Sequence, residues 1–192
     1  LGKIKINLEA IELDFLTLSG HKIGAPTGIG ALVYNNKINL MPQILGGGQE
    51  KGMRAGTENI LGIKGFGEAA KFVINVNKNN CLKVKSLRDY FQKKIKKISP
   101  ETIIFGEKAD RVANTLLIAL PKVPGDLALI KLDLESFSVS SGSACSSGKI
   151  SKSHVVSAMG YENLASNSVR FSLPPNDAIL NSENLITTKE LD

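Results

Sequence analysis

The sequence predicts an α/β protein, because apolar runs of strand length alternate along the chain with segments whose apolar residues have helical spacing. Groups of Gly, Asn, Ser and Pro separate these segments, as they do at turns and loops. Hydrophobic residues make up 42% of the 192 residues and charged residues 22%. This balance is typical of a folded globular protein and excludes a disordered or collagen-like chain.

The first half of the chain begins with two short strands. Ser19-Gly20 ends the first apolar run and Asn35-Asn36 ends the second, so both runs are followed by turn residues. The predicted elements are, in order, a buried strand over residues 12–18, a strand over 28–34, a polar glycine-rich loop over 46–57 and a helix over 59–76.

A second helix is predicted over residues 83–97, after a connector rich in Asn and Lys. Leu87, Tyr90, Phe91 and Ile95 fall on one face of this helix, and lysines cover the other. The chain has 24 basic and 18 acidic residues, and much of the net charge of +6 lies in this segment. We interpret it as a surface helix, because no nucleic-acid-binding motif accompanies it and aromatic residues are only 5% of the chain.

The second half of the chain alternates in the same way. Ser153 is placed to cap a helix that stops at Gly160, and Pro174-Pro175 ends the last strand. The predicted elements are, in order, strands over residues 102–105 and 114–120, a helix over 125–134, a strand over 137–140, a loop over 141–152, the helix that Ser153 caps, and a strand over 168–173. We place a domain boundary at the Asn/Lys connector, which divides the chain into residues 1–76 and 77–192.

Composition also bears on location and on metal binding. No apolar run approaches the roughly 18 residues of a membrane span and no signal peptide is visible, so we expect a cytoplasmic protein without a membrane partner. Cys81 and Cys145 are too few for a disulfide scaffold, and with two histidines they cannot build a four-ligand zinc site. We therefore expect no metal site and no nucleic-acid partner.

Ser19-Gly20-His21-Lys22 is the first of four segments that could carry chemistry. A lysine that forms a Schiff base must be held rigidly and must lose its proton easily, and the end of a buried strand favours both. Ser19 and His21 could donate hydrogen bonds to a phosphate. An ordinary solvated lysine is the alternative, because most of the 24 basic residues are lysines.

The glycine-rich loop from Gly46 to Asn59 is the second segment. Glycines let the backbone approach an anion, and Thr57 lies just before a predicted helix, where free N–H groups and the helix dipole favour phosphate. Arginine is rare in this chain, so Arg54 inside the loop points to an anion more strongly than another lysine would. An ordinary flexible loop is the alternative.

Cys145 lies in the third segment, a run of small polar residues from Val139 to Gly148. A thiol between Ser and Gly residues on a loop has the accessible setting that a reactive cysteine needs. Cys81, next to Leu82, is interpreted instead as a small hydrophobic residue of the core.

Arg170 marks the fourth segment, the strand Val-Arg-Phe-Ser-Leu over residues 169–173. Because arginine cannot lose its charge, an arginine among apolar strand residues needs an anionic partner. That partner could be a structural carboxylate or the carboxylate of a substrate. His154, in the helix after the cysteine loop, is interpreted as a structural or surface residue.

Together and in this order, the four segments resemble the cysteine desulfurases, pyridoxal-phosphate (PLP) enzymes of the class V aminotransferase group. The resemblance covers most of residues 1–173, and the serine-rich cysteine segment is similar to the subgroup that serves iron–sulfur cluster or thio-cofactor synthesis. The resemblance implies the C-terminal part of a fold-type I, aspartate aminotransferase-like enzyme. Residues 1–76 would be the end of the large PLP-binding domain, and residues 77–192 the small α+β domain with the cysteine loop.

The resemblance also implies which residues bind the cofactor. Lys22 would hold PLP as a Schiff base and move a proton during the reaction. Ser19 and His21 would bind the cofactor phosphate. Thr57 would reach the phosphate in the other subunit, which makes the enzyme a homodimer.

For the substrate, the resemblance implies roles for two further residues. Arg170 would bind the α-carboxylate of L-cysteine. Cys145 would take the substrate sulfur as a persulfide, leaving L-alanine. The persulfide would then pass to a sulfur-acceptor or iron–sulfur scaffold protein.

The sequence departs from the family pattern at one internal position and at both ends. Ala25 stands where a glycine is usual, the family's aspartate facing the pyridine nitrogen would precede Leu1, and the tail after Leu173 lacks the expected helical pattern. We therefore expect the C-terminal portion of a desulfurase, truncated or completed by a separately encoded N-terminal half. An inactive remnant or interaction module, and a selenocysteine lyase-like class V enzyme, are the alternatives.

Overall fold

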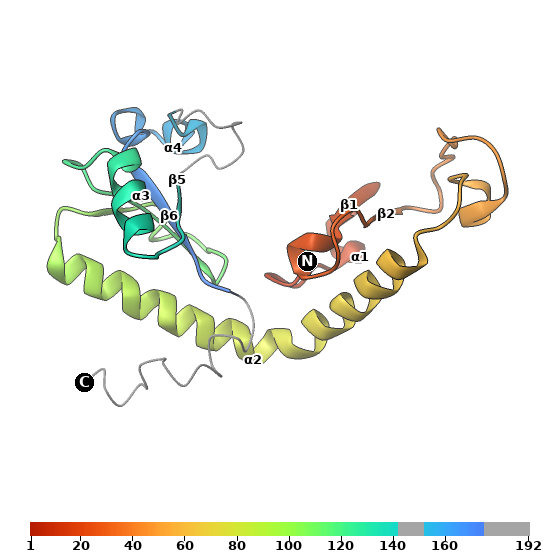
Figure 1. Ribbon diagram of the computed structural model, residues 1–192, viewed down its shortest axis with the longest axis horizontal. Coiled ribbons are helices and arrows are strands. Elements are labelled where there is room, and N and C mark those ends of the chain that lie inside the picture. Colours follow the sequence, from red (N-terminus) through yellow and green to blue (C-terminus); the bar gives the residue numbers. More distant parts are fainter. Residues whose placement is uncertain (142–151, 175–192) are drawn as a thin grey trace. The chain divides into compact units, whose positions relative to one another are not determined.

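A computed structural model describes residues 1–141 and 152–174 of the chain, without the side chains of residues 76–80. The chain forms two units, Leu1–Lys78 and Asn79–Asp192, and each contains both helices and strands (Figure 1). The predicted mixture of helices and strands is confirmed. Every described strand pair is antiparallel.

The first unit contains a two-stranded sheet. β1 (Phe15–Ser19) pairs with β2 (Gly30–Tyr34) in a register that runs from Phe15 opposite Tyr34 to Ser19 opposite Gly30. The other elements of this unit are α1 (Leu8–Ile11), the 3₁₀ helices η1 (Gly20–Ile23) and η2 (Gln49–Gly52), and the beginning of α2 (Ile60–Ile98).

β1 is a strand as predicted, but the prediction that it is buried is wrong. Side chains along β1 alternate between exposed and half-buried, and Phe15 keeps 46% of its surface exposed. Across the sheet, Leu32 of β2 is 49% exposed. A two-stranded sheet cannot bury its own faces, because each face needs another layer packed against it.

α2 is one continuous helix of 39 residues where the sequence predicts two helices and a connector. Asparagine in the expected connector lowers helix stability by less than about 1 kcal/mol per residue, which packing on either side outweighs. In the first unit, Gly65 lies so close to Pro26 that an added Cβ would come within 2.8 Å of its Cδ. In the second unit, Phe91 and Ile95 pack against the sheet.

The second unit is built on a four-stranded antiparallel sheet of order β3-β4-β6-β5. β6 is an interior strand, paired with β4 on one side and with β5 on the other. The strand predicted over residues 137–140 is shorter than expected, because the Phe137 N–H donates to Leu132 O at 2.8 Å and still belongs to the turn after a helix. The strands are β3 (Ile103–Ile104), β4 (Thr115–Ala119), β5 (Ser140–Ser141) and β6 (Ser168–Ser172).

Both faces of this sheet carry apolar clusters. Successive residues of β4 alternate between them, so Leu116 belongs to one cluster and Ala119 to the other. Leu116 is 1% exposed and Ala119 is 0% exposed. The first cluster consists of Ile104, Leu116 and Ile118, packed against Phe91, Ile95 and Phe171. The second consists of Phe105, Ala119, Val156 and Ala165, packed against Ile103, Leu117 and Leu164.

The helices of the second unit agree with the local signals in the sequence. α3 (Gly125–Leu134) begins and ends at the predicted residues. α4 (His154–Ala158) is capped as predicted, since Ser153 Oγ accepts a hydrogen bond from the Val156 N–H at 3.3 Å. A short 3₁₀ helix, η3 (Glu162–Leu164), leads from α4 toward β6.

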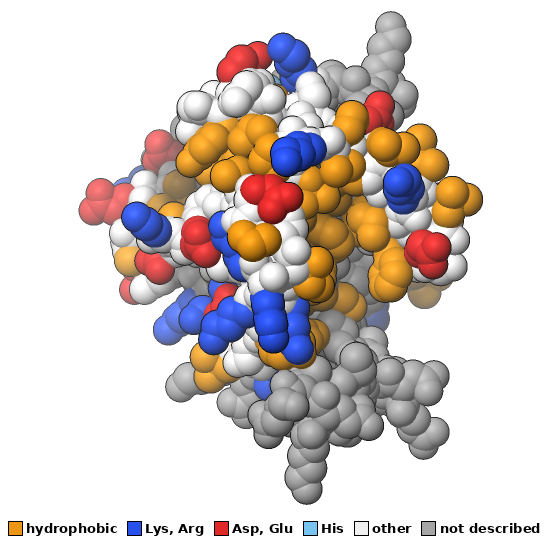
Figure 2. All heavy atoms as spheres, turned by 90° about the vertical axis from the view of Figure 1, so that its left-hand side faces the viewer, with side chains coloured by type: hydrophobic (Ala, Val, Ile, Leu, Met, Phe, Trp, Pro, Cys, Tyr) orange, Lys and Arg blue, Asp and Glu red, His pale blue; other side chains and the backbone are white. Residues whose placement is uncertain are grey.

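Large apolar side chains remain exposed on the outer side of α3. Leu127, Ile130 and Leu134, which follow one another at helical spacing, are 43%, 56% and 79% exposed. On the face drawn in Figure 2, hydrophobic side chains gather in the upper part with single Lys and Arg side chains among them, and a group of Lys and Arg side chains lies lower down.

Candidate active site

Ser19, His21 and Lys22 lie together in a tight turn at the end of β1. Gly20 fixes this turn through two backbone hydrogen bonds: its N–H donates to Ile29 O at 2.9 Å, and its O accepts from the Ala25 N–H at 3.1 Å. A Cβ at Gly20 would come within 2.9 Å of Ile29 O, so a larger residue there would shift the turn.

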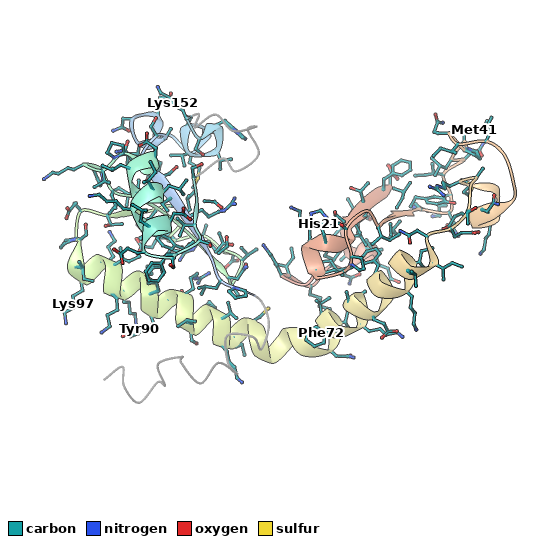
Figure 3. The ribbon with its side chains drawn as sticks, viewed as in Figure 1. His21, Met41, Phe72, Tyr90, Lys97 and Lys152 are labelled. Atoms are coloured by element: carbon teal, nitrogen blue, oxygen red, sulfur yellow. The ribbon has the colours of Figure 1, made fainter. Side chains whose placement is uncertain are left out.

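The side chains of Ser19 and His21 contact each other within this turn. Ser19 Oγ lies 3.0 Å from His21 Nδ1, a hydrogen-bonding distance, and both side chains are exposed. Figure 3 labels His21 in this turn. The second ring nitrogen of His21 has no partner among the described residues. A hydroxyl and an imidazole held side by side with an open donor suit a small anion such as a phosphate group.

Lys22 is exposed, so the partial burial expected for its amino group is not found in the described part of the chain. The reason is the exposure of β1, which carries this turn without a covering layer. Within the described residues Lys22 forms neither a hydrogen bond nor an ion pair. Its amino group is therefore available to a carbonyl compound.

The glycine-rich loop between β2 and α2 is held largely by its own backbone and side chains. The buried Ala55 donates its N–H to Ile44 O at 3.0 Å, and the Gly56 N–H donates to Gln49 Oε1 at 3.3 Å. Arg54 Nη1 donates to Gly56 O at 3.4 Å. The sequence predicts that Arg54 marks an anion site. In the structure, one of its nitrogens is used to stabilise the loop itself.

Thr57 is exposed and lies just before α2, which begins at Ile60. Asn59, and not Thr57, caps the helix, because Asn59 Oδ1 accepts a hydrogen bond from the Gly62 N–H at 3.0 Å. No described hydrogen bond joins Thr57 to the turn that holds Lys22. Within the first unit, Thr57 and the lysine turn therefore remain separate groups.

Arg170 lies in the middle of β6, and its Nε is buried without a hydrogen-bond partner among the described residues. Arg170 also forms no ion pair within residues 1–141 and 152–174, so the structural carboxylate that the sequence left open is not found there. It is the one charged residue in the four strands of its sheet. A guanidinium with a buried, unpaired N–H favours an anionic ligand, because an unsatisfied buried donor costs about 1–3 kcal/mol.

Arg170 sits in a row of residues that crosses the sheet. In the strand register, Leu117 of β4 lies opposite Arg170 on one side and Ser140 of β5 on the other. Directly opposed residues of antiparallel strands share one face of the sheet. β5 lies within the predicted cysteine segment and ends at Ser141, where the predicted loop begins; Cys145 itself lies outside the described residues.

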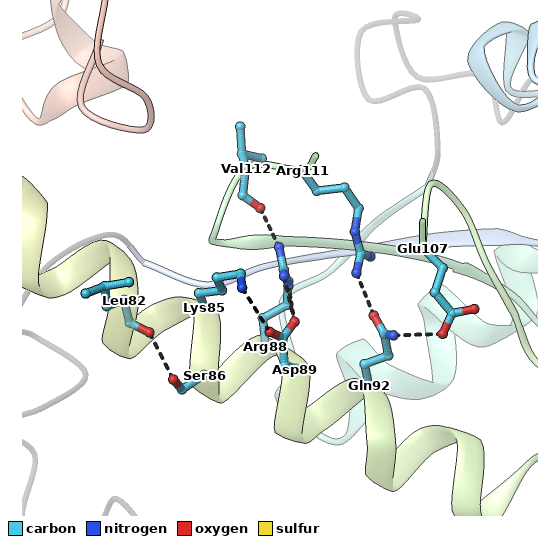
Figure 4. A network of polar contacts seen from close by, with 9 residues as sticks. All are labelled: Leu82, Lys85, Ser86, Arg88, Asp89, Gln92, Glu107, Arg111 and Val112. Carbon is cyan, nitrogen blue, oxygen red and sulfur yellow. Dashed lines mark hydrogen bonds and ion pairs between the residues drawn. The ribbon is translucent and has the colours of Figure 1, made fainter. Parts of the chain in front are cut away.

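Arg88 is a buried charged residue that the sequence analysis did not single out (Figure 4). It is 4% exposed, and its Nε and Nη2 donate to Asp89 Oδ1 at 3.0 and 2.6 Å. Its Nη1 donates to Val112 O at 2.8 Å, which ties α2 to the segment before β4. The helical spacing of Val84, Arg88, Phe91 and Ile95 is the signal that could have predicted its burial.

A second arginine, Arg111, extends this network. Its Nη1, like Nε of Arg170, is buried without a hydrogen-bond partner among the described residues, but the carboxylates of Asp89 and Glu107 lie near its charge. Arg111 Nη2 donates to Gln92 Oε1 at 2.8 Å, and Gln92 Nε2 donates to Glu107 Oε1 at 3.0 Å. The pKa of Arg111 is lowered, mainly by burial and to a smaller extent by the nearby positive charge of Arg88. Because these contacts connect α2 with the loop that leads to β4, we interpret the network as structural.

In the part of the chain that the structure describes, no three side chains of His, Cys, Asp or Glu are grouped to hold a metal ion. Among those same residues, no helix is both long enough and apolar enough to span a membrane.

Comparisons with known proteins match nearly the whole chain. The family model described as Aminotransferase class-V matches residues 1–180. Cysteine desulfurase 2 of Trichormus variabilis is 39% identical over 174 residues, which are 90% of this chain and 44% of that protein. Cysteine desulfurase IscS of Dictyoglomus turgidum is 37% identical over 191 residues, which are 99% of this chain and 46% of that protein.

A solved structure gives the same result for the fold. The X-ray structure of a NifS-like protein from Rickettsia africae matches with a TM-score of 0.80 and 38% identity, covering 99% of this chain and 48% of that chain. The predicted resemblance in fold is confirmed. The chain spans less than half the length of the relatives that it matches.

Proposed function

Because the chain belongs to the class V aminotransferase family, we propose that it contributes the lysine turn, the carboxylate site and the cysteine segment of a PLP-dependent cysteine desulfurase. The reaction would convert L-cysteine to L-alanine and leave the sulfur on Cys145. The unpaired guanidinium of Arg170 is the observation that carries this proposal, because it calls for an anionic ligand beside the strand that leads to Cys145. The names of the similar desulfurases support it.

The turn after β1 fits PLP in the types of group that it offers. Ser19 and His21 would offer hydrogen-bonding groups to the cofactor phosphate, and Lys22 would hold the cofactor through its exposed amino group. When bound, PLP supplies an electron sink for reactions at the substrate Cα. Thr57 would contact the cofactor phosphate in the other subunit of a homodimer.

The substrate would be bound through its α-carboxylate. Arg170 would hold that carboxylate and so orient the thiol of L-cysteine toward Cys145. Lys22 would move the proton at the substrate Cα.

Sulfur transfer would take place at Cys145. Its thiolate would attack the substrate sulfur, so that an S–S bond forms while the carbon–sulfur bond breaks. The carbon would keep the electron pair of that bond and take up a proton, giving L-alanine. The Cys145 persulfide would pass its outer sulfur to an acceptor or scaffold protein for iron–sulfur cluster or thio-cofactor synthesis.

The test is the conversion of L-cysteine to alanine in the presence of PLP and a thiol reductant. The 192-residue chain is assayed alone and after co-expression with the N-terminal half of the Trichormus variabilis desulfurase. We expect the combination to release alanine and sulfide in equal amounts, and Cys145→Ser to abolish both. Alanine release that survives Cys145→Ser, or turnover of L-selenocysteine but not of L-cysteine, would contradict the proposal.

A further inference from the structure

Ser140 lies beside Arg170 on the same face of the sheet. In the β5–β6 pair, Ser140 is directly opposite Arg170 and Ser141 is directly opposite Val169. Opposed residues share a face, with Cβ atoms about 4.5–5.5 Å apart. Successive residues of one strand point to opposite faces. Ser140 therefore flanks the arginine, and its neighbour Ser141 does not.

The Ser140 hydroxyl is free for a further hydrogen bond. The side chain is half-buried and makes no hydrogen bond within the described residues. On the opposite side of Arg170, Leu117 offers an apolar side chain that packs with the second core cluster. In the row across the sheet, Ser140 is thus the one side chain able to share a ligand with Arg170.

A carboxylate has the shape and capacity for both groups. Its two oxygens offer about four acceptor sites, of which a guanidinium uses at most two. A hydroxyl next to the guanidinium can donate to one of the remaining sites. No described strand of the sheet contributes a carboxylate of its own, and Arg170 forms no ion pair with any other described residue, the acidic residues of the neighbouring α3 included.

We propose that Ser140 donates a hydrogen bond to the carboxylate that Arg170 binds, and so helps to set the affinity and orientation of the amino-acid substrate. This inference rests on the proposed function for the identity of the substrate. Loss of one hydrogen bond to a charged group should weaken carboxylate binding about tenfold. Ser140→Thr keeps the hydroxyl and should keep most of the affinity.

A direct test uses acetate as the carboxylate probe and the full chain labelled with ¹⁵N. The buried Nε–H of Arg170 should exchange slowly and give a side-chain NMR signal, which is assigned by its loss in Arg170→Lys. We expect acetate to shift this signal, and Ser140→Ala to require about tenfold more acetate for the same shift. Ser141→Ala is the matched control, because it lies on the other face, and should behave like the unmodified chain.

The inference is overturned if acetate leaves the Arg170 signal unchanged, if Ser140→Ala binds acetate as well as the unmodified chain, or if Ser141→Ala weakens binding equally. In the co-expressed enzyme, Ser140→Ala should raise the KM for L-cysteine about tenfold with little change in kcat, because uniform binding is lost. If the acetate results come out as expected but no alanine forms from L-cysteine, the carboxylate site stands and the desulfurase proposal fails.

Discussion

Replacement of Arg170 by methionine should stabilise the protein while it removes the proposed carboxylate site. The Nε of Arg170 is buried in the sheet without an acceptor, and the side chain has no ion-pair partner among the described residues. Methionine has a similar length, no polar atom and enough flexibility to fill the same space between Leu117 and Ser140. The folded state would thus lose an unsatisfied donor and keep most of its packing.

The expected change in the free energy of unfolding follows from the part of the guanidinium that is buried. An unsatisfied buried donor costs about 1–3 kcal/mol. Because Nε is the only nitrogen of Arg170 that is buried without a partner, the lower end applies, and we expect Arg170→Met to raise the free energy of unfolding by about 1 kcal/mol. For a domain of this size that is a rise in Tm of about 4 °C. Thermal unfolding of the full chain, followed by far-UV circular dichroism, measures it.

Arg88→Met is the matched control, because it removes a buried arginine that is fully engaged. Arg88 donates to Val112 O and to Asp89 Oδ1, and both acceptors would be left behind. Since the Asp89 side chain is 39% exposed, water can replace part of the loss, and we expect a destabilisation of about 2–3 kcal/mol. If Arg170→Met destabilised the chain as much as Arg88→Met, Arg170 would have a structural partner, and the reasoning for a free anion site would be refuted.

The other predictions concern the cofactor, the nucleophile and the distribution of stability. In the co-expressed enzyme, Lys22→Ala should abolish the absorbance band of the lysine-bound cofactor, and an unchanged band would rule out Lys22 as its attachment point. Cys145→Ser should eliminate the persulfide detected by mass spectrometry and leave PLP absorbance intact, whereas a persulfide on Cys81 would reverse the assignment of the two cysteines. Hydrogen exchange should be slowest in β4 and β6 and fastest in β1 and β2, because the buried apolar side chains gather in the second unit; equal protection of the two sheets would contradict this.

The sequence correctly predicts helices whose ends are fixed by residues next to them in the chain, such as a proline or a capping serine. α3 begins at Gly125, directly after Pro124, and its bounds match the prediction. Ser153 caps α4 through its own side chain, so its role is visible in the sequence. The connector predicted from its Asn and Lys residues is instead part of α2, because tertiary packing at each end of the helix outweighs their weak preference against helix.

Burial depends on neighbours that no local pattern specifies. An apolar run over residues 12–18 is typical of a buried strand, yet β1 pairs only with β2 in the described sheet and stays exposed. Arg88 shows the opposite error, since a charged residue within a lysine-rich helix is buried by the loop that carries Val112. In both cases the outcome is decided by contacts between residues far apart in the sequence.

The same distinction holds within the candidate site. Ser19, His21 and Lys22 are near neighbours in the sequence and lie in one turn, so the sequence alone could place these three side chains together. Arg170 could be recognised as an arginine in need of an anion, but its lack of a structural partner could not be predicted. The alignment of Ser140 with Arg170 depends on the register of β5 against β6, which two short strands distant in sequence acquire only when the sheet forms.

The two groups of site residues are therefore held by different means. The turn around Lys22 depends on two hydrogen bonds of Gly20 and on the absence of a Cβ there, so it can keep its shape although β1 and β2 are exposed. The row of Arg170 and Ser140 depends on the whole sheet, whose two apolar clusters fix β6 between β4 and β5. A core substitution such as Leu116→Ala should consequently weaken carboxylate binding at Arg170. It should leave the backbone of the Lys22 turn unchanged, because the hydrogen bonds that fix this turn join residues of the first unit and none of the four-stranded sheet.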